Sequence, residues 1–239
     1  MQGIILKSVC AIREGRFIRT LRNYLAKTLV TGNWLVIKGM SYLPDDKRIS
    51  VSADDYVRIS ALELMSREIN NKDIKGNVAE LGVYQGDFAK YINQFFSGRK
   101  LYLFDTFEGF NDKDIFVDIE GGHSTGTQDF SNTSVELVMK KMPNRRDCVI
   151  RKGWFPESTS GLDDEEYVFV SIDADLFEPI YHGLCYFGPK LKHGGAIFVH
   201  DFNNKHYHGS AAAVRKFSVE KEIGYFLLPD ECGTAVLLK

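Results

Sequence analysis

Four acidic residues stand near the ends of short apolar runs along the chain. They are Glu80 in NVAELGV (77–83), Asp105 in KLYLFDT (100–106), Asp173 in YVFVSID (167–173) and Asp201 in GAIFVHD (195–201). If these runs are parallel strands, their carboxyl ends lie on one edge of a sheet, where open α/β sheets bind ligands. Capping of the following helices explains one or two such acids, but it explains four poorly. We therefore expect the four carboxylates to form one site.

The turn after the first run suggests what this site binds. Its sequence, ELGVYQGD (80–87), contains Gly82 and Gly86 but not the GxGxxG pattern of nicotinamide and flavin enzymes. A turn that begins with a carboxylate and spreads its glycines suits a cofactor without a phosphate, although such glycines also serve tight strand-to-helix packing. Asp105, about one βα unit later, is placed to bond a ribose diol.

The elements that must position these residues follow an alternating pattern. Helical stretches are expected at 54–69, 87–96, 134–142, 179–192 and 210–223, and a further strand at 148–153. Continuous apolar strands joined by helical crossovers are typical of a parallel sheet covered on both faces. The final segment, YFLLPDECGTAVLLK, predicts two strands joined by a turn, and hence an antiparallel hairpin at the end of the sheet.

Two segments do not fit the alternation. Residues 111–128, with GGHSTG at their centre, show no periodicity, and we expect a lid or substrate loop, with plain disorder as the alternative. Before residue 50, four arginines recur every third position on an expected helix, as a solvated face or as a docking surface for an anionic group. These arginines are Arg13, Arg16, Arg19 and Arg22.

Composition narrows the classes of partner. The 239 residues hold 30 basic and 32 acidic side chains, so the net charge of −2 predicts no attraction to nucleic acid or to an anionic membrane. A small molecule is the expected substrate. The four cysteines form no CxxC pair, and the first apolar run is too short for a signal peptide or a membrane span. We expect a cytoplasmic protein.

Seven segments carry a family resemblance. In order they are AELGVYQGD, LYLFDTFEGF, DFSNTS, KGWFPEST, SIDADLFEP, GGAIFVHDF and the terminal hairpin. On these segments the chain resembles the macrocin and mycinamicin O-methyltransferase family, whose members methylate sugar hydroxyls of antibiotics. The resemblance implies an α/β, Rossmann-like class I methyltransferase fold with a seven-stranded, mostly parallel sheet at 51–239. A helical segment at 1–50 would act as a lid or as the contact of a homo-oligomer.

The same resemblance implies S-adenosylmethionine as cofactor and assigns residues to it. Glu80, Gly82, Tyr84 and Gly86 would line the methionine end, Asp105, Thr106 and Phe107 would meet the ribose, and Asp129, Ser131, Gly153 and Trp154 would contact the adenosine part. It also implies a divalent metal, most often magnesium, on Asp173 and Asp201. The family usually has two adjacent aspartates after the fifth strand, whereas this chain has His200 before Asp201. A histidine ligand suits manganese, iron or zinc better than magnesium.

The leading functional hypothesis is methyl transfer to a hydroxyl of a sugar or glycosylated small molecule. Asp173 would act through the metal, and the candidates for the general base are His200, His123, His206, His208 and Asp175. A nucleotide-cofactor oxidoreductase is the first alternative, disfavoured by the missing GxGxxG pattern. A binding protein that keeps the cofactor pocket without turnover is the second, and the altered aspartate pair is its only support.

Overall fold

The computed structural model describes residues 55–125 and 127–239. They belong to one unit, which spans Val51–Lys239. The expected N-terminal helical segment, with its four arginines, lies outside the described residues. No helix of the described part is long and apolar enough to cross a membrane.

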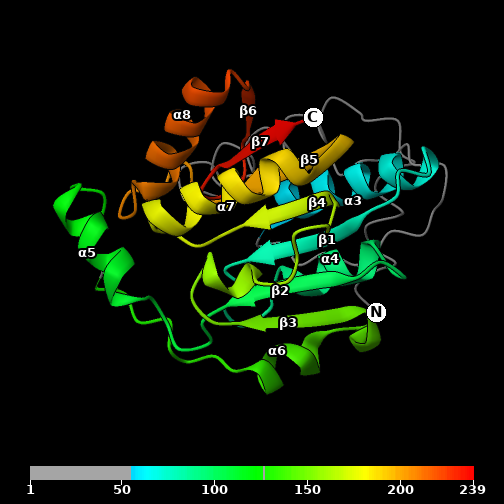
Figure 1. Ribbon diagram of the computed structural model, residues 1–239, viewed down its shortest axis with the longest axis horizontal. Coiled ribbons are helices and arrows are strands. Elements are labelled where there is room, and N and C mark those ends of the chain that lie inside the picture. The colour runs from blue at the N-terminus through cyan, green and yellow to red at the C-terminus, as the bar shows by residue number, and fades with distance from the viewer. Residues whose placement is uncertain (1–54, 126) are drawn as a thin grey trace, which may run out of the picture. The chain divides into compact units, whose positions relative to one another are not determined.

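A seven-stranded sheet with the strand order β3-β2-β1-β4-β5-β7-β6 forms the centre of the described unit (Figure 1). The parallel strands are β1 (Asn77–Leu81), β2 (Leu101–Asp105), β3 (Cys148–Lys152), β4 (Tyr167–Ile172) and β5 (Leu191–Val199). Strand β7 (Thr234–Leu238) pairs antiparallel with β5 and with β6 (Tyr225–Leu228). The parallel sheet and the antiparallel hairpin are thus confirmed. The strand order reverses between β1 and β4, which places the switch point of the sheet there.

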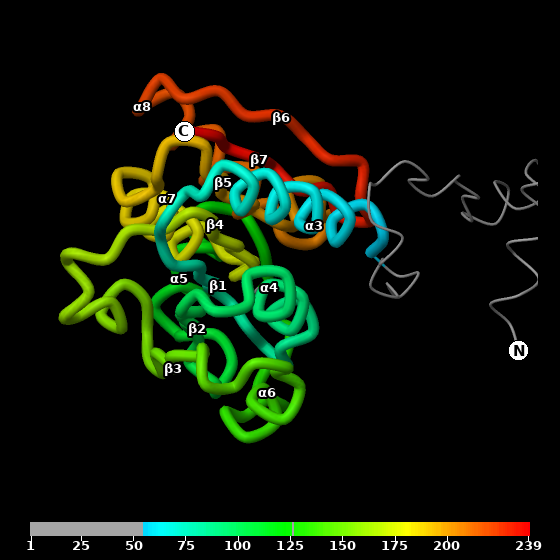
Figure 2. The backbone as a smooth tube through the Cα atoms, turned by 90° about the vertical axis from the view of Figure 1, so that its right-hand side faces the viewer, coloured from blue at the N-terminus to red at the C-terminus, as the bar shows by residue number. Residues whose placement is uncertain are grey.

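Helices cover both faces of this sheet. On one face lie α3 (Tyr56–Asn71), α4 (Ala89–Phe95) and α6 (Val135–Lys141), and on the other lie α7 (Phe177–Lys190) and α8 (Gly209–Lys221) (Figure 2). Single 3-10 turns occur at Arg145–Asp147 and Glu157–Thr159. The helices expected from the sequence are confirmed within about three residues at each end, the usual uncertainty of helix boundaries.

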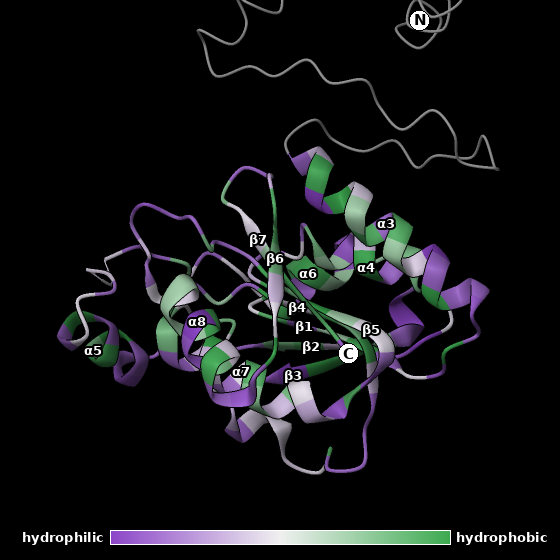
Figure 3. Cartoon of the chain, turned by 90° about the horizontal axis from the view of Figure 1, so that it is seen from above, coloured by the Kyte–Doolittle hydropathy of each residue, from purple (hydrophilic) through white to green (hydrophobic). Residues whose placement is uncertain are grey.

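Each face of the sheet has its own hydrophobic core. Because side chains alternate across a strand, Val78 of β1 packs with α3 and α4, whereas its neighbour Ala79 packs with α7. Strand β4 is buried at every position, as expected for a central parallel strand. Figure 3 shows hydrophilic residues mainly in the connecting loops and on the outer parts of the helices.

One expectation about the fold is wrong. The segment 111–128, expected to lack regular structure, contains the helix α5 (Asp112–Glu120), whose first turn is capped by the Asn111 side chain accepting from Lys113 N at 3.0 Å. The helix lies beyond the carboxyl ends of the strands and beside α7 (Figure 1). Its buried positions are the acids Asp114 and Asp118, while Phe116 is 60% exposed. The hydrophobic pattern therefore does not mark the inner face of this helix.

Candidate active site

A cavity of about 730 Å³ opens at the carboxyl ends of β1, β2, β4 and β5. Its volume falls within the roughly 300 to 1,000 Å³ that ligand pockets occupy. The structure brings all four strand-end acids together in its lining, as expected from their spacing: Glu80, Asp105, Asp173 and Asp201. The cavity also lies at the switch point of the sheet, where this architecture binds ligands.

The turn after β1 needs its first glycine because two strands approach each other closely there. Gly82 has φ +82°, and a Cβ atom on it would lie 2.1 Å from the backbone oxygen of Asp173 at the end of β4. Gly86 does not line the cavity; with φ +79° it packs against Val138 and Met142 near α6. The two glycines thus have different uses, and only the first shapes the cavity.

Asp105 joins the turns after β1 and β2. One carboxylate oxygen accepts from the backbone nitrogens of Val83 at 2.7 Å and Tyr84 at 2.8 Å, and the other accepts from Phe107 N at 2.6 Å. A carboxylate has about four lone-pair sites, so roughly one is left for a ligand. Asp105 can therefore hold the glycine turn and still accept a hydrogen bond from a bound molecule.

Glu80 lines the cavity with a buried carboxyl group. Its side chain is 1% exposed, and its Oε2 atom has no hydrogen-bond partner. Burial raises the pKa of Glu80 well above its usual range, against the opposing effect of Arg58. Because buried polar atoms are nearly always paired, this oxygen is available to a donor on a ligand.

Arg58 of α3 is a site residue that the sequence did not reveal. It is buried, and its guanidinium donates to Asp173 Oδ2 and to Ser171 Oγ, both at 3.0 Å. The same group lies 3.7 Å from the centre of the Phe88 ring. Arg58 therefore holds the Oδ2 atom of Asp173, the carboxylate oxygen that does not face His200. The two partners are 115 residues apart in the chain, so no local pattern connects them.

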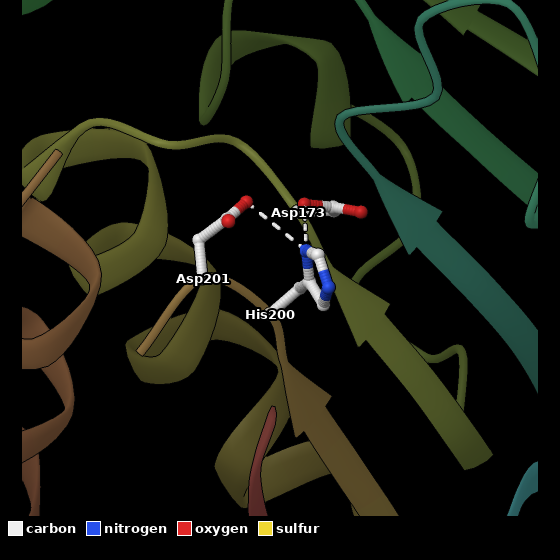
Figure 4. A group of neighbouring side chains, drawn as sticks. All are labelled: Asp173, His200 and Asp201. Carbon is white, nitrogen blue, oxygen red and sulfur yellow. Dashed lines mark hydrogen bonds and ion pairs between the residues drawn. The ribbon is translucent and has the colours of Figure 1, made fainter. Parts of the chain in front are cut away.

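Asp173, His200 and Asp201 converge at the ends of β4 and β5 (Figure 4). The Nδ1 atom of His200 lies 3.2 Å from Asp173 Oδ1 and 3.0 Å from Asp201 Oδ2, while Nε2 points away from both carboxylates. Burial favours the neutral ring, but the attraction of Asp173 outweighs it and raises the pKa of His200 to about 10. Burial likewise opposes ionisation of Asp173, but His200 and Arg58 lower its pKa below the usual range.

These three side chains fit a divalent cation. Their ligand atoms lie within 4.8 Å of one another. The separations of 3.0 and 3.2 Å from His200 Nδ1 are also those of adjacent ligands in an octahedron with metal–ligand distances of about 2.1 Å. The second oxygen of each carboxylate is already held, by Arg58 on Asp173 and by Asn204 on Asp201 at 3.0 Å. Such outer partners commonly orient metal ligands.

The base candidates separate by position. His200 and Asp175 line the cavity, whereas His123, His206 and His208 do not. The His123 ring stacks on Phe177 at the start of α7, with centroids 5.1 Å apart. Burial, with the neighbouring carboxylates, raises the pKa of Asp175 well above its usual range. Two of the five candidates thus remain in position to meet a substrate.

Of the residues assigned to the cofactor by resemblance, some line the cavity and others do not. Those that line the cavity, besides the acids, are Gly82, Tyr84, Thr106, Gly153 and Trp154. Phe107 is buried in the core, and Asp129 and Ser131 are exposed, with Asp129 accepting from Ser131 N at 2.8 Å. These three do not line the cavity. The roles of all these residues toward a cofactor stay predictions.

Two further groups line the cavity without having been expected. Asp114 of α5 accepts from Trp154 Nε1 at 2.9 Å, and burial raises the pKa of Asp114 to about 6. Phe110 and Phe130 meet edge to face with ring centroids 4.9 Å apart, and Phe130 meets Tyr84 in the same way at 5.2 Å. The segment around Phe130 is therefore joined to the glycine turn.

Several solved structures of methyltransferases share this fold. The O-methyltransferase NovP matches with a TM-score of 0.61 and 17% identity over 77% of this chain and 80% of that one. CalS11, a calicheamicin methyltransferase, matches with a TM-score of 0.60 and 18% identity over 95% and 94%. An O-methyltransferase from Bacillus cereus in complex with SAH matches with a TM-score of 0.50 and 11% identity over 99% and 97%. These likenesses show that the chain has the class I methyltransferase fold.

The family follows from the sequence. A family model described as macrocin-O-methyltransferase (TylF) matches residues 45–228. The chain belongs to the macrocin O-methyltransferase family, which confirms the resemblance, and it is an S-adenosylmethionine-dependent methyltransferase. A search of curated proteins finds no match.

Proposed function

We propose that this enzyme methylates a hydroxyl of a sugar or glycosylated small molecule, with a divalent cation at Asp173, His200 and Asp201. The observation that carries the proposal is the convergence of these three side chains in the same cavity as Glu80 and Asp105. Membership of the macrocin family supports a sugar acceptor, as does the description of CalS11 as a TDP-rhamnose 3'-O-methyltransferase.

The charge of the cavity supports a sulfonium cofactor. Among the described residues its lining contains Arg58 and Lys90 as the only arginine and lysine, and these pair with Asp173 and Asp87. The acids of the lining are Asp55, Glu80, Asp87, Asp105, Asp114, Asp173, Asp175 and Asp201. The carboxylates outnumber the cationic groups of the lining even when His200 is counted among them, so the cavity favours a cation over a pyrophosphate, which argues against the oxidoreductase alternative.

We assign the chain's own residues as follows. Asp105 accepts from the ribose diol with its remaining lone pair, and Oε2 of Glu80 accepts from the ammonium group of the methionine end. Asp173, His200 and Asp201 hold the cation, and the imidazole ligand favours manganese, iron or zinc over magnesium. Such an ion supplies a lowered pKa of the acceptor hydroxyl and a fixed position for its oxygen. Asp175 is the side chain in place to receive the proton, because an imidazole that binds the cation through Nδ1 carries its own proton on Nε2. His200 becomes the candidate base only if no cation is bound.

The test combines binding with turnover. Calorimetry with S-adenosylmethionine, S-adenosylhomocysteine and NAD should show binding of the first two only. Methyl transfer to a panel of glycosides and nucleotide sugars is then followed after chelation, with magnesium, manganese or zinc added back, on the wild type and on Asp173→Asn. Full activity after rigorous chelation refutes the proposed role of a divalent cation. Binding of the cofactor without transfer to any member of the panel argues against a sugar hydroxyl as the acceptor.

A further inference from the structure

Two loops carry the three side chains that converge at the site. Residues 173–176 join β4 to α7 and contain Asp173, and residues 200–208 join β5 to α8 and contain His200 and Asp201. Each loop includes a non-glycine residue with left-handed backbone, Asp175 and Asp201, both with φ +59°. Such conformations persist only where surrounding contacts impose them. The contacts at the far end of each loop therefore matter for the site.

Asp118 of α5 holds the end of the first loop. Its side chain is 0% exposed, and Oδ1 accepts at 2.7 Å from the backbone nitrogen of Phe177, the first residue of α7. Its Oδ2 accepts from Ser124 Oγ at 2.7 Å. Leu176, the residue before α7, offers no side-chain cap. Asp118 thus caps a helix from 59 residues away in the chain.

The turn that follows α5 holds the end of the second loop. The backbone oxygen of His123 accepts at 2.8 Å from the backbone nitrogen of His208, which directly precedes α8. The His123 ring stacks on Phe177 of the first loop's helix. Residues 118–124 therefore contact the ends of both loops.

The two loops also meet each other at this point. A Cβ atom on Gly209, the first residue of α8, would lie 2.5 Å from Phe177 N and 3.1 Å from the backbone oxygen of Asp175. The approach leaves no room for a side chain. The starts of α7 and α8 are therefore in direct backbone contact. The segment 118–124 forms one hydrogen bond at each of these two helix starts.

We propose that the segment 118–124 positions the two loops, and that Asp118 is its principal positioning residue. Resting on the proposed function, this inference assigns α5 a fixed role in holding Asp173 and Asp201 at the separation a cation needs. It also replaces the interpretation of residues 111–128 as a lid. Asp118 touches neither cofactor nor acceptor; it acts through the Phe177 amide.

The test is Asp118→Ala, compared with Asp118→Asn, which keeps an acceptor oxygen for Phe177 N. In the alanine variant we expect Mn²⁺ affinity, measured by electron paramagnetic resonance, to fall by about tenfold. This is the lower end of the effect of losing a partner bonded directly to a metal ligand, because Asp118 acts through the Phe177 amide. Affinity for S-adenosylhomocysteine should stay within about twofold, because the residues around the glycine turn are untouched. The asparagine variant should recover most of the Mn²⁺ affinity.

Ser134→Ala is the matched control. Ser134 caps α6 by accepting from Leu137 N at 3.1 Å, and α6 contributes no residue to the cavity lining. This control loses a comparable cap and should lower the melting temperature without changing Mn²⁺ affinity. If Asp118→Ala behaves like Ser134→Ala, the proposal is overturned. Should Asp118→Ala fail to fold, Ser124→Ala serves in its place, since it removes the donor that holds Oδ2.

A second measurement separates this proposal from the proposed function. If the wild type binds S-adenosylhomocysteine but no Mn²⁺, the proposed cation site is refuted, and so is the assignment of Asp118 to it. If the wild type binds both, hydrogen exchange at the Phe177 and His208 amides decides the mechanism. Faster exchange at both amides in Asp118→Ala, with cofactor binding intact, supports the proposal that the segment 118–124 holds both loops. Unchanged exchange at His208 overturns the coupling of the two loops.

Discussion

Replacement of Asp105 by alanine should weaken cofactor binding more than any other single change at the ribose end. The substitution removes the acceptor for three backbone amides, those of Val83, Tyr84 and Phe107, at 2.6 to 2.8 Å. It also removes the remaining lone pair, which we assign to the ribose diol. A hydrogen bond to a charged group contributes about 1.5 to 3 kcal/mol, so the loss of that one contact lowers affinity about ten- to a hundredfold.

The assay must separate the diol contact from the support of the glycine turn. Calorimetry measures S-adenosylhomocysteine and its 2',3'-dideoxy analogue on the wild type and on Asp105→Ala. One loss of affinity comes from removing the ligand's hydroxyls and the other from removing the Asp105 carboxylate. If the carboxylate bonds the diol, these two losses overlap, and the analogue binds the variant about as well as S-adenosylhomocysteine does. If Asp105 only supports the turn, the two losses add. A melting curve confirms that the variant is folded at the temperature of the assay.

Two results would refute the reasoning. Unchanged affinity for S-adenosylhomocysteine in Asp105→Ala would remove the residue from the cofactor site altogether. Strictly additive losses would leave it only the contacts with Val83, Tyr84 and Phe107 that the structure shows.

Three further predictions follow from the cavity and its glycine turn. Asp129→Ala should change affinity for S-adenosylhomocysteine by less than about twofold, because the side chain is exposed and outside the cavity lining; a tenfold loss by calorimetry would restore the adenosine role implied by resemblance. Gly82→Ala should abolish cofactor binding and lower the melting temperature, since its Cβ would meet Asp173 O at 2.1 Å; near-normal binding would contradict the close approach. Burial raises the pKa of Asp114 to about 6, above its ordinary unfolded value of about 3.9, so its contribution to stability is present at low pH and is lost as pH rises through 6. The melting temperature of Asp114→Asn relative to wild type should therefore increase between about pH 4 and pH 7, and a constant difference would argue against the shift.

The sheet could be predicted from the sequence because its strands are marked locally. Strand β4 is buried on both faces and reads as one apolar run, and Asp173 follows it at once. Parallel pairing then dictates that Asp105 and Asp201 end on the same edge. For these acids a local pattern and a general rule of sheet geometry were sufficient.

The rest of the site depends on contacts between distant segments. Arg58 reaches Asp173 from a helix that shows only an ordinary amphipathic pattern, and Asp118 caps α7 from α5. Helix α5 itself escaped prediction because it buries aspartates, so its inner face carries no hydrophobic signal. The base candidates His123 and His200 could not be ranked either, because their distance from the cavity depends on how the loops pack.

The antiparallel pairing of β7 has a consequence for how the protein is made. Strand β6 pairs only with β7 within the described sheet. The turn between these strands holds the two residues that follow Asp201. Gly233 O accepts from Phe202 N at 2.9 Å, and Cys232 O accepts from Asn203 N at 2.8 Å. None of these contacts can form until residues 232–238 have left the ribosome. Because a domain folds as a unit once its chain has emerged, the loop that carries Asp201 is secured only when the C-terminal hairpin is available. A chain that ends before residue 230 would thus lack the two backbone hydrogen bonds that hold Phe202 and Asn203 next to Asp201.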